Sequence, residues 1–195
     1  MRQKDPKQTP LSQGNFFGEV SLLFPCLRTA TVKSQNYCTL AYLKKDNFIE
    51  LWAYSPDTFH DIEEHALRYK DKWIQFKIKL LRQIDYFDTE KYNEEFFVRI
   101  QYHMQEMIYQ KGNQILGFEE DCTNIYFIVN GKVDLEIMDQ EGNIHVLETL
   151  QQGDNIGQYS VLYHSDLVFR IMAKSTSVRL LTLNDKFFLD YGDKN

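Results

Sequence analysis

The feature that most constrains the fold of this chain is an internal repeat built around paired glycines. Residues 11–24 read LSQGNFFGEVSLLF and residues 150–163 read LQQGDNIGQYSVLY, so that two glycines of each segment match at one offset. A later pair, CTLAYLKKDNF at 38–48 and VRLLTLNDKFF at 178–188, follows at an offset one residue longer. Chance similarity in a β-rich chain is the alternative. Agreement of glycine spacing with apolar pattern favours two copies of one structural unit.

The second copy carries the pattern of a small β-protein. Short runs with alternating or β-branched residues, separated by Lys-Gly, Asn-Gly and Glu-Gly dipeptides, occupy residues 107–116, 125–138 and 145–150. Such dipeptides favour turns, and we interpret Lys111-Gly112 and Asn130-Gly131 as hairpin turns. The pattern predicts an α+β fold that is mainly β, a double-stranded β-helix (jelly-roll) barrel with flanking helices.

The first copy has no matching strands ahead of its glycine segment. Only ten residues, rich in polar side chains, precede Leu11. We therefore expect tandem copies of which the first is truncated at its N-terminus and lacks about half of its barrel. Either the chain is a fragment, or the missing strands come from elsewhere.

A helical region is predicted between the two copies. Ser55-Pro56-Asp57 is a typical helix start, with serine as N-cap and proline at the first helical position. Apolar residues then alternate at spacings of three and four, which is typical of a heptad seam. The seam consists of Phe59, Ile62, Ala66, Tyr69, Trp73, Phe76 and Leu80. It suits a helix packed on its own domain, a helix-mediated oligomer, or a lid that can lift away.

A second, shorter amphipathic helix is predicted within residues 89–106. The domain boundaries that follow are residues 1–54 for the half of a first domain, 55–106 for linking or lid helices, and 107–195 for the second domain.

Composition narrows the functional classes. The chain of 195 residues has 43% apolar residues, enough for a core, and a formal net charge of −6, which argues against nucleic acid as a partner. Three cysteines lack the spacing of metal ligands, which suits a reduced cytoplasmic setting. No apolar run reaches the ~18 residues of a membrane span. We expect a cytoplasmic location, which includes the cytosolic face of a membrane protein.

The candidate chemistry lies between Gly18 and Thr29. Gly18 permits a close backbone approach just before Val20, Leu22 and Leu23, whose spacing suits one turn of helix, and Ser21 lies in that turn. The free N–H groups of a helix start can bind an anion. Arg28 supplies a planar charged fork that matches two phosphate oxygens, and Glu19 supplies an acceptor for a sugar hydroxyl. Taken alone, a glutamate and an arginine at this spacing are also compatible with a surface ion pair.

The segment FGEVSLLFPCLRTATV resembles the phosphate-binding cassette of the cyclic-nucleotide-binding domain family. That family includes kinase regulatory subunits, cyclic-nucleotide-gated channels, exchange factors and bacterial catabolite activators. The resemblance covers about residues 11–54 and 82–191. It implies cAMP or cGMP as ligand, with no further cofactor.

The resemblance also implies individual roles. Glu19 would hold the ribose 2′-hydroxyl and Arg28 the cyclic phosphate, while the backbone of Gly18, Val20 and Ser21 would complete the cradle. Thr29 follows the arginine, at a position where a hydroxyl in this family often favours guanine. The helix after Ser55 would be the lid.

The second copy departs from this pattern in its degenerate site, Gly157, Gln158, Ser160 and Arg170. Gln158 stands at the glutamate position, Val168 falls on the arginine position, and Arg170 is two residues further along the chain. A neutral amide in place of the carboxylate costs about 1 kcal/mol, and loss of the arginine about 3 kcal/mol or more. The sum corresponds to roughly a thousandfold in affinity. We expect the second copy to bind cyclic nucleotide poorly or not at all, and to act in structure or coupling.

No catalytic motif or metal-binding constellation is evident, because the five histidines are scattered and no serine elbow or Walker loop occurs. We therefore expect a regulatory module and not an enzyme. Its expected effector is the pore of a cyclic-nucleotide-regulated cation channel. The alternatives are a regulatory subunit or domain of a cyclic-nucleotide-dependent kinase, and a ligand-free structural or interaction protein in a larger assembly.

Overall fold

The computed structural model describes residues 10–24, 26–69, 72–87 and 92–187. The chain divides into two compact units, residues 1–69 (unit 1) and residues 70–195 (unit 2). Pro25 of the cassette motif and Phe188 of the repeat lie outside the described residues. No helix in the described ranges has the length and apolar character needed to cross a membrane.

Unit 1 is helical where it is regular. The helices are α1 (Val20–Leu23), α2 (Lys45–Tyr54) and α3 (Pro56–Leu67). The single turn of α1 and the start of α3 agree with prediction: Pro56 opens α3 after Ser55, whose hydroxyl lies 2.8 Å from the Thr58 hydroxyl. Helix α2 was not predicted from the sequence. It packs on α3 through a stack of Trp52 on Phe59, with ring centroids 3.6 Å apart.

The stretch between α1 and α2 is irregular and exposed. No strand occurs among the described residues of unit 1. Apolar side chains there lie in solvent, with Val32 at 50%, Leu40 at 67% and Tyr42 at 82% exposure. A strand needs a neighbouring strand for its backbone hydrogen bonds, and this stretch has no described strand to pair with.

The described part of unit 2 includes the helices α4 (Lys72–Leu81), α5 (Glu94–Ile100) and α6 (Gln158–Tyr163) and the 3₁₀ turn η1 (Gln101–His103). The predicted seam is not one continuous helix, because Arg68 and Tyr69 lie outside helices. The N–H groups of these two residues bond the carbonyls three positions back, which tightens and ends the last turn of α3. At the start of α5 the Asn93 side chain caps the amide of Phe96 at 3.0 Å.

Unit 2 contains two four-stranded antiparallel sheets. Sheet A has the order β1 (Gln105–Gln110), β8 (Ser177–Asn184), β3 (Asn124–Asn130) and β6 (Asn155–Ile156). Sheet B has the order β2 (Gln114–Leu116), β7 (Arg170–Ala173), β4 (Lys132–Met138) and β5 (Ile144–Gln151). Two sheets of non-sequential antiparallel strands fit the predicted jelly roll.

Two predicted hairpin turns are instead crossings between the sheets. β1 and β2 flank Lys111-Gly112 but pair with β8 and β7, and β3 and β4 flank Asn130-Gly131 but lie in different sheets. A turn dipeptide favours a reversal of the chain. It does not determine whether the strands before and after it pair with each other or with strands of different sheets. Only the third turn, between β4 and β5, closes a hairpin among these three.

The core of unit 2 lies between the two sheets. Residues from both sheets form one buried cluster, in which Ile128, Val133, Ile171 and Leu180 are 0% exposed. Other residues of β3 and β8, such as Phe127 and Leu183, are also 0% exposed without belonging to that cluster. The central strands β3 and β8 of sheet A are thus buried on both faces, which explains why β3 has a continuous apolar run instead of an alternating one.

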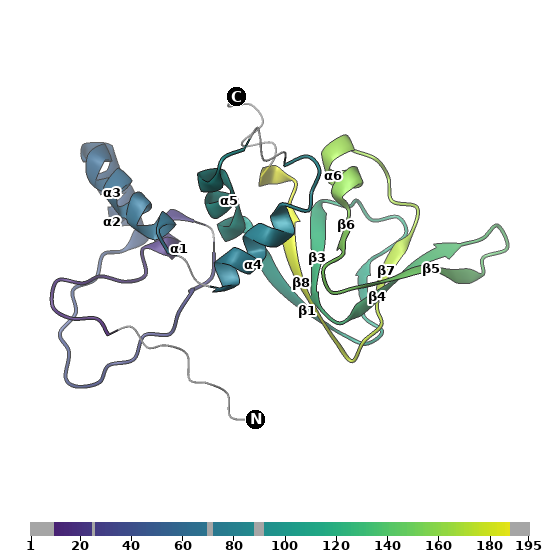
Figure 1. Ribbon diagram of the computed structural model, residues 1–195, viewed down its shortest axis with the longest axis horizontal. Helices are drawn as coiled ribbons and strands as arrows, with labels where there is room; N and C mark the ends of the chain where they lie inside the picture. The colour runs from purple at the N-terminus through teal and green to yellow at the C-terminus, as the bar shows by residue number, and fades with distance from the viewer. Residues whose placement is uncertain (1–9, 25, 70–71, 88–91, 188–195) are drawn as a thin grey trace. The chain divides into compact units, whose positions relative to one another are not determined.

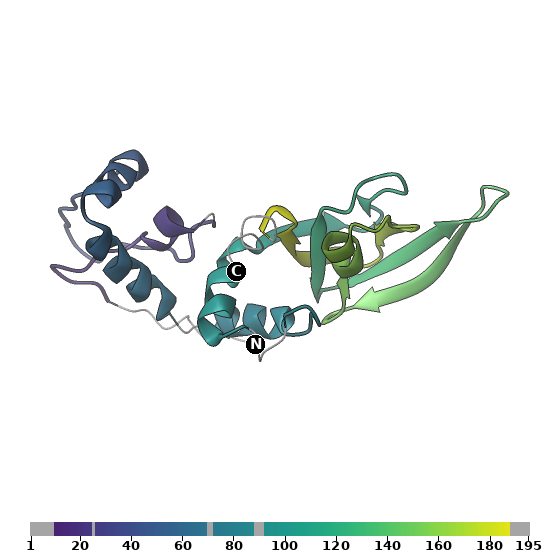
Figure 2. The same ribbon diagram turned by 90° about the horizontal axis from the view of Figure 1, so that it is seen from above.

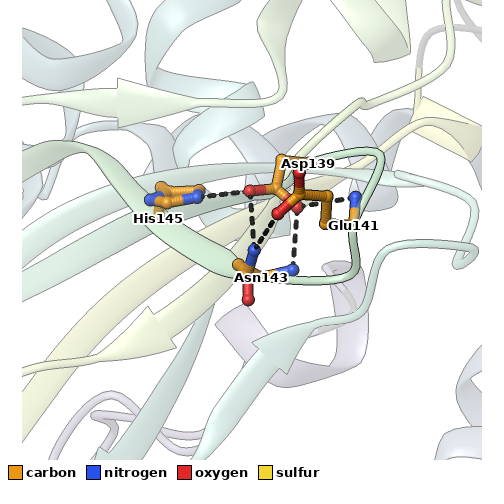
Figure 3. A network of polar contacts seen from close by, with 4 residues as sticks. All are labelled: Asp139, Glu141, Asn143 and His145. Carbon is orange, nitrogen blue, oxygen red and sulfur yellow. Dashed lines mark hydrogen bonds and ion pairs between the residues drawn. The ribbon is translucent and has the colours of Figure 1, made fainter.

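The β4–β5 hairpin projects beyond the other strands of unit 2 (Figure 1, Figure 2). Asp139 organises its turn by accepting hydrogen bonds from the amides of Glu141 and Asn143, both at 2.9 Å, and by pairing with His145 at 2.8 Å (Figure 3). The hydrogen bond to His145, followed by those of Asn143, holds the pKa of Asp139 well below its usual 3.8.

We expect this turn to loosen in acid. Because the folded-state pKa of Asp139 is lowered, its contribution is present above pH 3.8 and is lost as the pH falls below that value. Hydrogen exchange should show that the protection factors of the Glu141 and Asn143 amides decrease from pH 5 toward pH 3. In the Asp139→Asn variant they should be lower and independent of pH.

The turn before β2 provides the control, since the Gln110 amide donates to the non-titrating Asn113 side chain. Equal acid sensitivity at Gln110 and at Glu141 would contradict the assignment to Asp139.

Candidate functional site

The cassette of unit 1 is folded back on itself around Gly18. Gly18 has φ of +90°, and a Cβ there would lie 2.7 Å from Nη1 of Arg28. That nitrogen donates to the Gly18 carbonyl at 3.1 Å and to the Ser21 hydroxyl at 2.7 Å. The left-handed backbone favours glycine, and a Cβ at this position would displace the end of the Arg28 side chain. Arg28 is thereby held beside the start of α1, with its side chain exposed to solvent.

Glu19 is the buried carboxylate of this cassette. Its residue is only 5% exposed, and its Oε1 accepts a hydrogen bond of 2.7 Å from the Tyr69 hydroxyl. Its Oε2 is buried and has no hydrogen-bond partner among the described residues. A buried carboxylate oxygen without a donor is destabilising, because it has lost its hydrogen bonds to water and has no hydrogen bond within the protein to replace them.

The remaining predicted residues of the first cassette lie close by in the chain but differ in burial. Val20 is 5% exposed and anchors α1, and the Ser21 hydroxyl donates to the Gly18 carbonyl at 3.2 Å. Thr29 follows Arg28 in the exposed irregular stretch. In the hydrogen bonds described above, Glu19 and Arg28 therefore have partners other than one another.

The second glycine segment repeats this backbone. Gly157 has φ of +86° and precedes α6, as Gly18 with φ of +90° precedes the helical turn α1. A Cβ on Gly157 would lie 2.6 Å from the Asn124 carbonyl oxygen and 2.7 Å from Sγ of Cys122. The fold of unit 2 alone thus explains this glycine, whether or not a ligand binds. Ser160 is buried at 6% exposure.

The polar residues of the second segment do not form the same arrangement. Arg170 on β7 donates from Nε to Glu136 on β4 at 2.7 Å and stacks 5.3 Å over the ring of Phe118. It alternates with Ile171, a core residue, so its side chain lies on the face of sheet B away from the core. Val168 is 77% exposed, and Oε1 of Gln158 is buried without a described partner.

Sequence reasoning missed several contacts that shape these segments. Tyr69 was assigned to the helix seam, and nothing in its spacing signals a bond to Glu19 across fifty positions. Glu136 and Phe118 were not singled out as partners of Arg170. A polar hollow of about 320 Å³ lined by His103, Gln105, Asn124, Thr182 and Asn184 was also not foreseen, and it shares no residue with either glycine segment.

The sequence model of the cyclic nucleotide-binding domain matches residues 106–195. Residues 106–195 belong to the cyclic nucleotide-binding domain family. The match covers the strands, α6 and the degenerate segment of unit 2. The chain therefore carries a cyclic nucleotide-binding regulatory domain.

Two curated relatives are similar to this chain over different lengths. Human cGMP-dependent protein kinase 2 is 22% identical over 173 residues, which is 88% of this chain and 21% of the kinase. The rabbit potassium/sodium hyperpolarization-activated cyclic nucleotide-gated channel 4 is 34% identical over 108 residues, 53% of this chain and 9% of the channel. The chain thus spans about a fifth or less of either relative.

A solved structure confirms the fold. The regulatory domain of Toxoplasma gondii PKA, crystallised with cAMP, superposes with a TM-score of 0.55 at 17% identity, over 64% of this chain and 46% of that one. The ligand in that structure is cAMP.

Proposed function

We propose that this chain is a cyclic-nucleotide sensor whose binding residues lie in unit 1, with unit 2 as a coupling domain that binds nucleotide poorly. The observation that carries the proposal is Glu19, a buried carboxylate with an unpartnered Oε2 beside the start of α1. A ribose hydroxyl is a suitable donor for that oxygen. Arg28, ten residues further on, presents its guanidinium to the same helical turn for a phosphate.

Three findings support a tandem arrangement with a truncated first copy. The glycines at 14 and 153 have φ of +85° and +99°, and those at 18 and 157 agree within a few degrees. The kinase relative aligns with 88% of the chain, well beyond the domain at residues 106–195. The exposed apolar stretch after α1 is what a half-barrel without its partner strands would leave. A donor of those strands would complete the walls of the site.

The experiment is a titration of the whole protein with fluorescent cAMP and cGMP, followed by anisotropy. We expect saturable binding in the micromolar range for at least one nucleotide, and weaker binding of its 2′-deoxy analogue, since that analogue leaves Glu19 without a donor. Absence of saturable binding to the native chain would favour the ligand-free structural role instead.

A companion prediction concerns unit 2. Arg170→Ala should leave nucleotide affinity unchanged within about twofold and lower the free energy of unfolding by about 1 kcal/mol, because Glu136 loses its partner in a largely buried pair. Isothermal titration and urea unfolding measure the two effects. A large loss of affinity would instead place Arg170 in a functional second site.

The proposed effector is the pore of a cation channel, in which the chain would be part of a cytoplasmic tail without enzymatic activity. The higher identity of the channel relative, 34%, supports this assignment. The kinase alternative is favoured by the longer alignment of 173 residues with cGMP-dependent protein kinase 2. The full transcript distinguishes the two: six apolar spans in the same reading frame would indicate a channel, and a docking helix with a pseudosubstrate would indicate a kinase regulator.

A further inference from the structure

Glu19 is held by a residue that lies outside the cassette. Tyr69 follows the C-cap of α3, and its hydroxyl donates to Oε1 of Glu19 at 2.7 Å. The other oxygen, Oε2, is buried and has no partner in the described part of the chain. One oxygen of the carboxylate is therefore engaged by the protein, while the other is buried and lacks a donor.

The tyrosine ring is itself held in place. The ring of His65, one helical turn earlier, meets it edge-on with centroids 5.6 Å apart, and Nε2 of His65 lies 3.4 Å from the Tyr69 hydroxyl. His65 is in turn packed against Phe16, with the two ring centroids 5.2 Å apart. These contacts direct the hydroxyl toward Glu19 although Tyr69 is 40% exposed.

We infer that Tyr69 is a positioning residue that makes the cassette selective for ligands with a 2′-hydroxyl. This inference rests on the proposed nucleotide site. Tyr69 acts through Glu19 and does not itself contact the ligand: by engaging Oε1 it fixes the carboxylate rotamer and leaves Oε2 facing the ribose hydroxyl. Without the tyrosine hydroxyl, Oε1 lacks a donor, and the carboxylate can turn to share one incoming hydroxyl or water between its two oxygens.

The opposite role, in which Tyr69 competes with the ligand for Glu19, makes a different prediction. A competitor would occupy the oxygen that the ribose needs, and its removal would raise affinity. The unpartnered Oε2 favours positioning over competition, because a ligand hydroxyl can bind there while the Tyr69 bond remains.

The test is Tyr69→Phe in the full chain, with cAMP and cGMP each compared with its 2′-deoxy analogue by competition against a fluorescent nucleotide. Phenylalanine keeps the ring and removes only the hydroxyl. We expect the affinity for the nucleotide that the native chain binds to fall about tenfold. The affinity for its 2′-deoxy analogue should change less than twofold. Tyr54→Phe, at an 87% exposed tyrosine of the same unit, is the matched control and should change neither affinity.

The outcomes separate the roles. Equal losses for both ligands would mean that Tyr69 is only structural, and a gain in affinity would mean that it competes with the ligand. Unchanged affinity for both would mean that Glu19 needs no positioning. Each of these results overturns the inference while leaving the nucleotide site intact. A native chain that binds no nucleotide overturns the proposed function, and this inference with it.

Discussion

Arg28→Ala is expected to weaken cyclic-nucleotide binding to the whole chain by about a hundredfold. Loss of the charged hydrogen bonds from a guanidinium to a bound phosphate costs about 3 kcal/mol, because the anion then lacks its charged donor. In the structure the Arg28 guanidinium bonds the Gly18 carbonyl and the Ser21 hydroxyl, at the start of α1 where a phosphate would meet free amides. Isothermal titration with cAMP and cGMP measures the change.

Arg68→Ala provides the control for net charge. Arg68 belongs to the same unit, and its pair with Glu64 is a solvent-exposed contact between neighbouring turns of α3. Its loss should change nucleotide affinity less than twofold. If both variants bind as tightly as the native chain, the phosphate does not lie at Arg28.

The largest expected effect on stability is that of Gly157→Ala in unit 2. Alanine at φ of +86° costs about 1 kcal/mol in backbone strain. Its Cβ would also lie 2.6 Å from the Asn124 carbonyl, a backbone atom of β3 that cannot move without disturbing sheet A. We expect this overlap to add about 2 kcal/mol, for a total loss of about 3 kcal/mol in the free energy of unfolding.

Gly142→Ala is a matched control for this experiment. Gly142 has the same φ of +86°, and a Cβ there would meet nothing within 4 Å. It should cost only the strain of about 1 kcal/mol. Urea unfolding followed by Trp73 fluorescence, in a Trp52→Phe background, measures both variants in unit 2. Equal losses of unfolding free energy in the two variants would mean that the Asn124 carbonyl and Cys122 can shift to accommodate the new methyl group, and would contradict the crowding described above.

The sequence predicted those features that depend on local chemistry. The helical turn after Gly18, the start of α3 at Pro56 and the two-sheet fold of unit 2 are confirmed. Each rests on neighbouring residues: a glycine before an apolar turn, a serine and proline at a helix start, or alternating runs between turn dipeptides.

Features that depend on distant partners were predicted wrongly or not at all. Asn130-Gly131 reverses the chain, but whether β4 stays beside β3 depends on which strands are available across the core. The helix α2 was missed because its packing on Phe59 is set by α3 and not by its own pattern, and the seam through Tyr69 was assumed to be continuous.

The candidate site was predicted as a set of residues, without their arrangement. Glu19 and Arg28 could be named from residue type and spacing, but the bond between Tyr69 and Glu19 joins residues fifty positions apart. Likewise, the sequence placed Arg170 near the arginine position of the second segment, whereas its engagement by Glu136 follows from the pairing of β4 with β7. The assignment of nucleotide binding to these residues stays a prediction.

An amide-resolved NMR titration of the full chain with cAMP and cGMP tests most directly whether unit 1 holds the nucleotide. The account predicts the largest chemical-shift changes at the amides of Gly18, Glu19 and Ser21, with a smaller response at Gly157 and Ser160. Saturable changes centred on Gly157 and Ser160, with Gly18 and Glu19 unaffected, would contradict it.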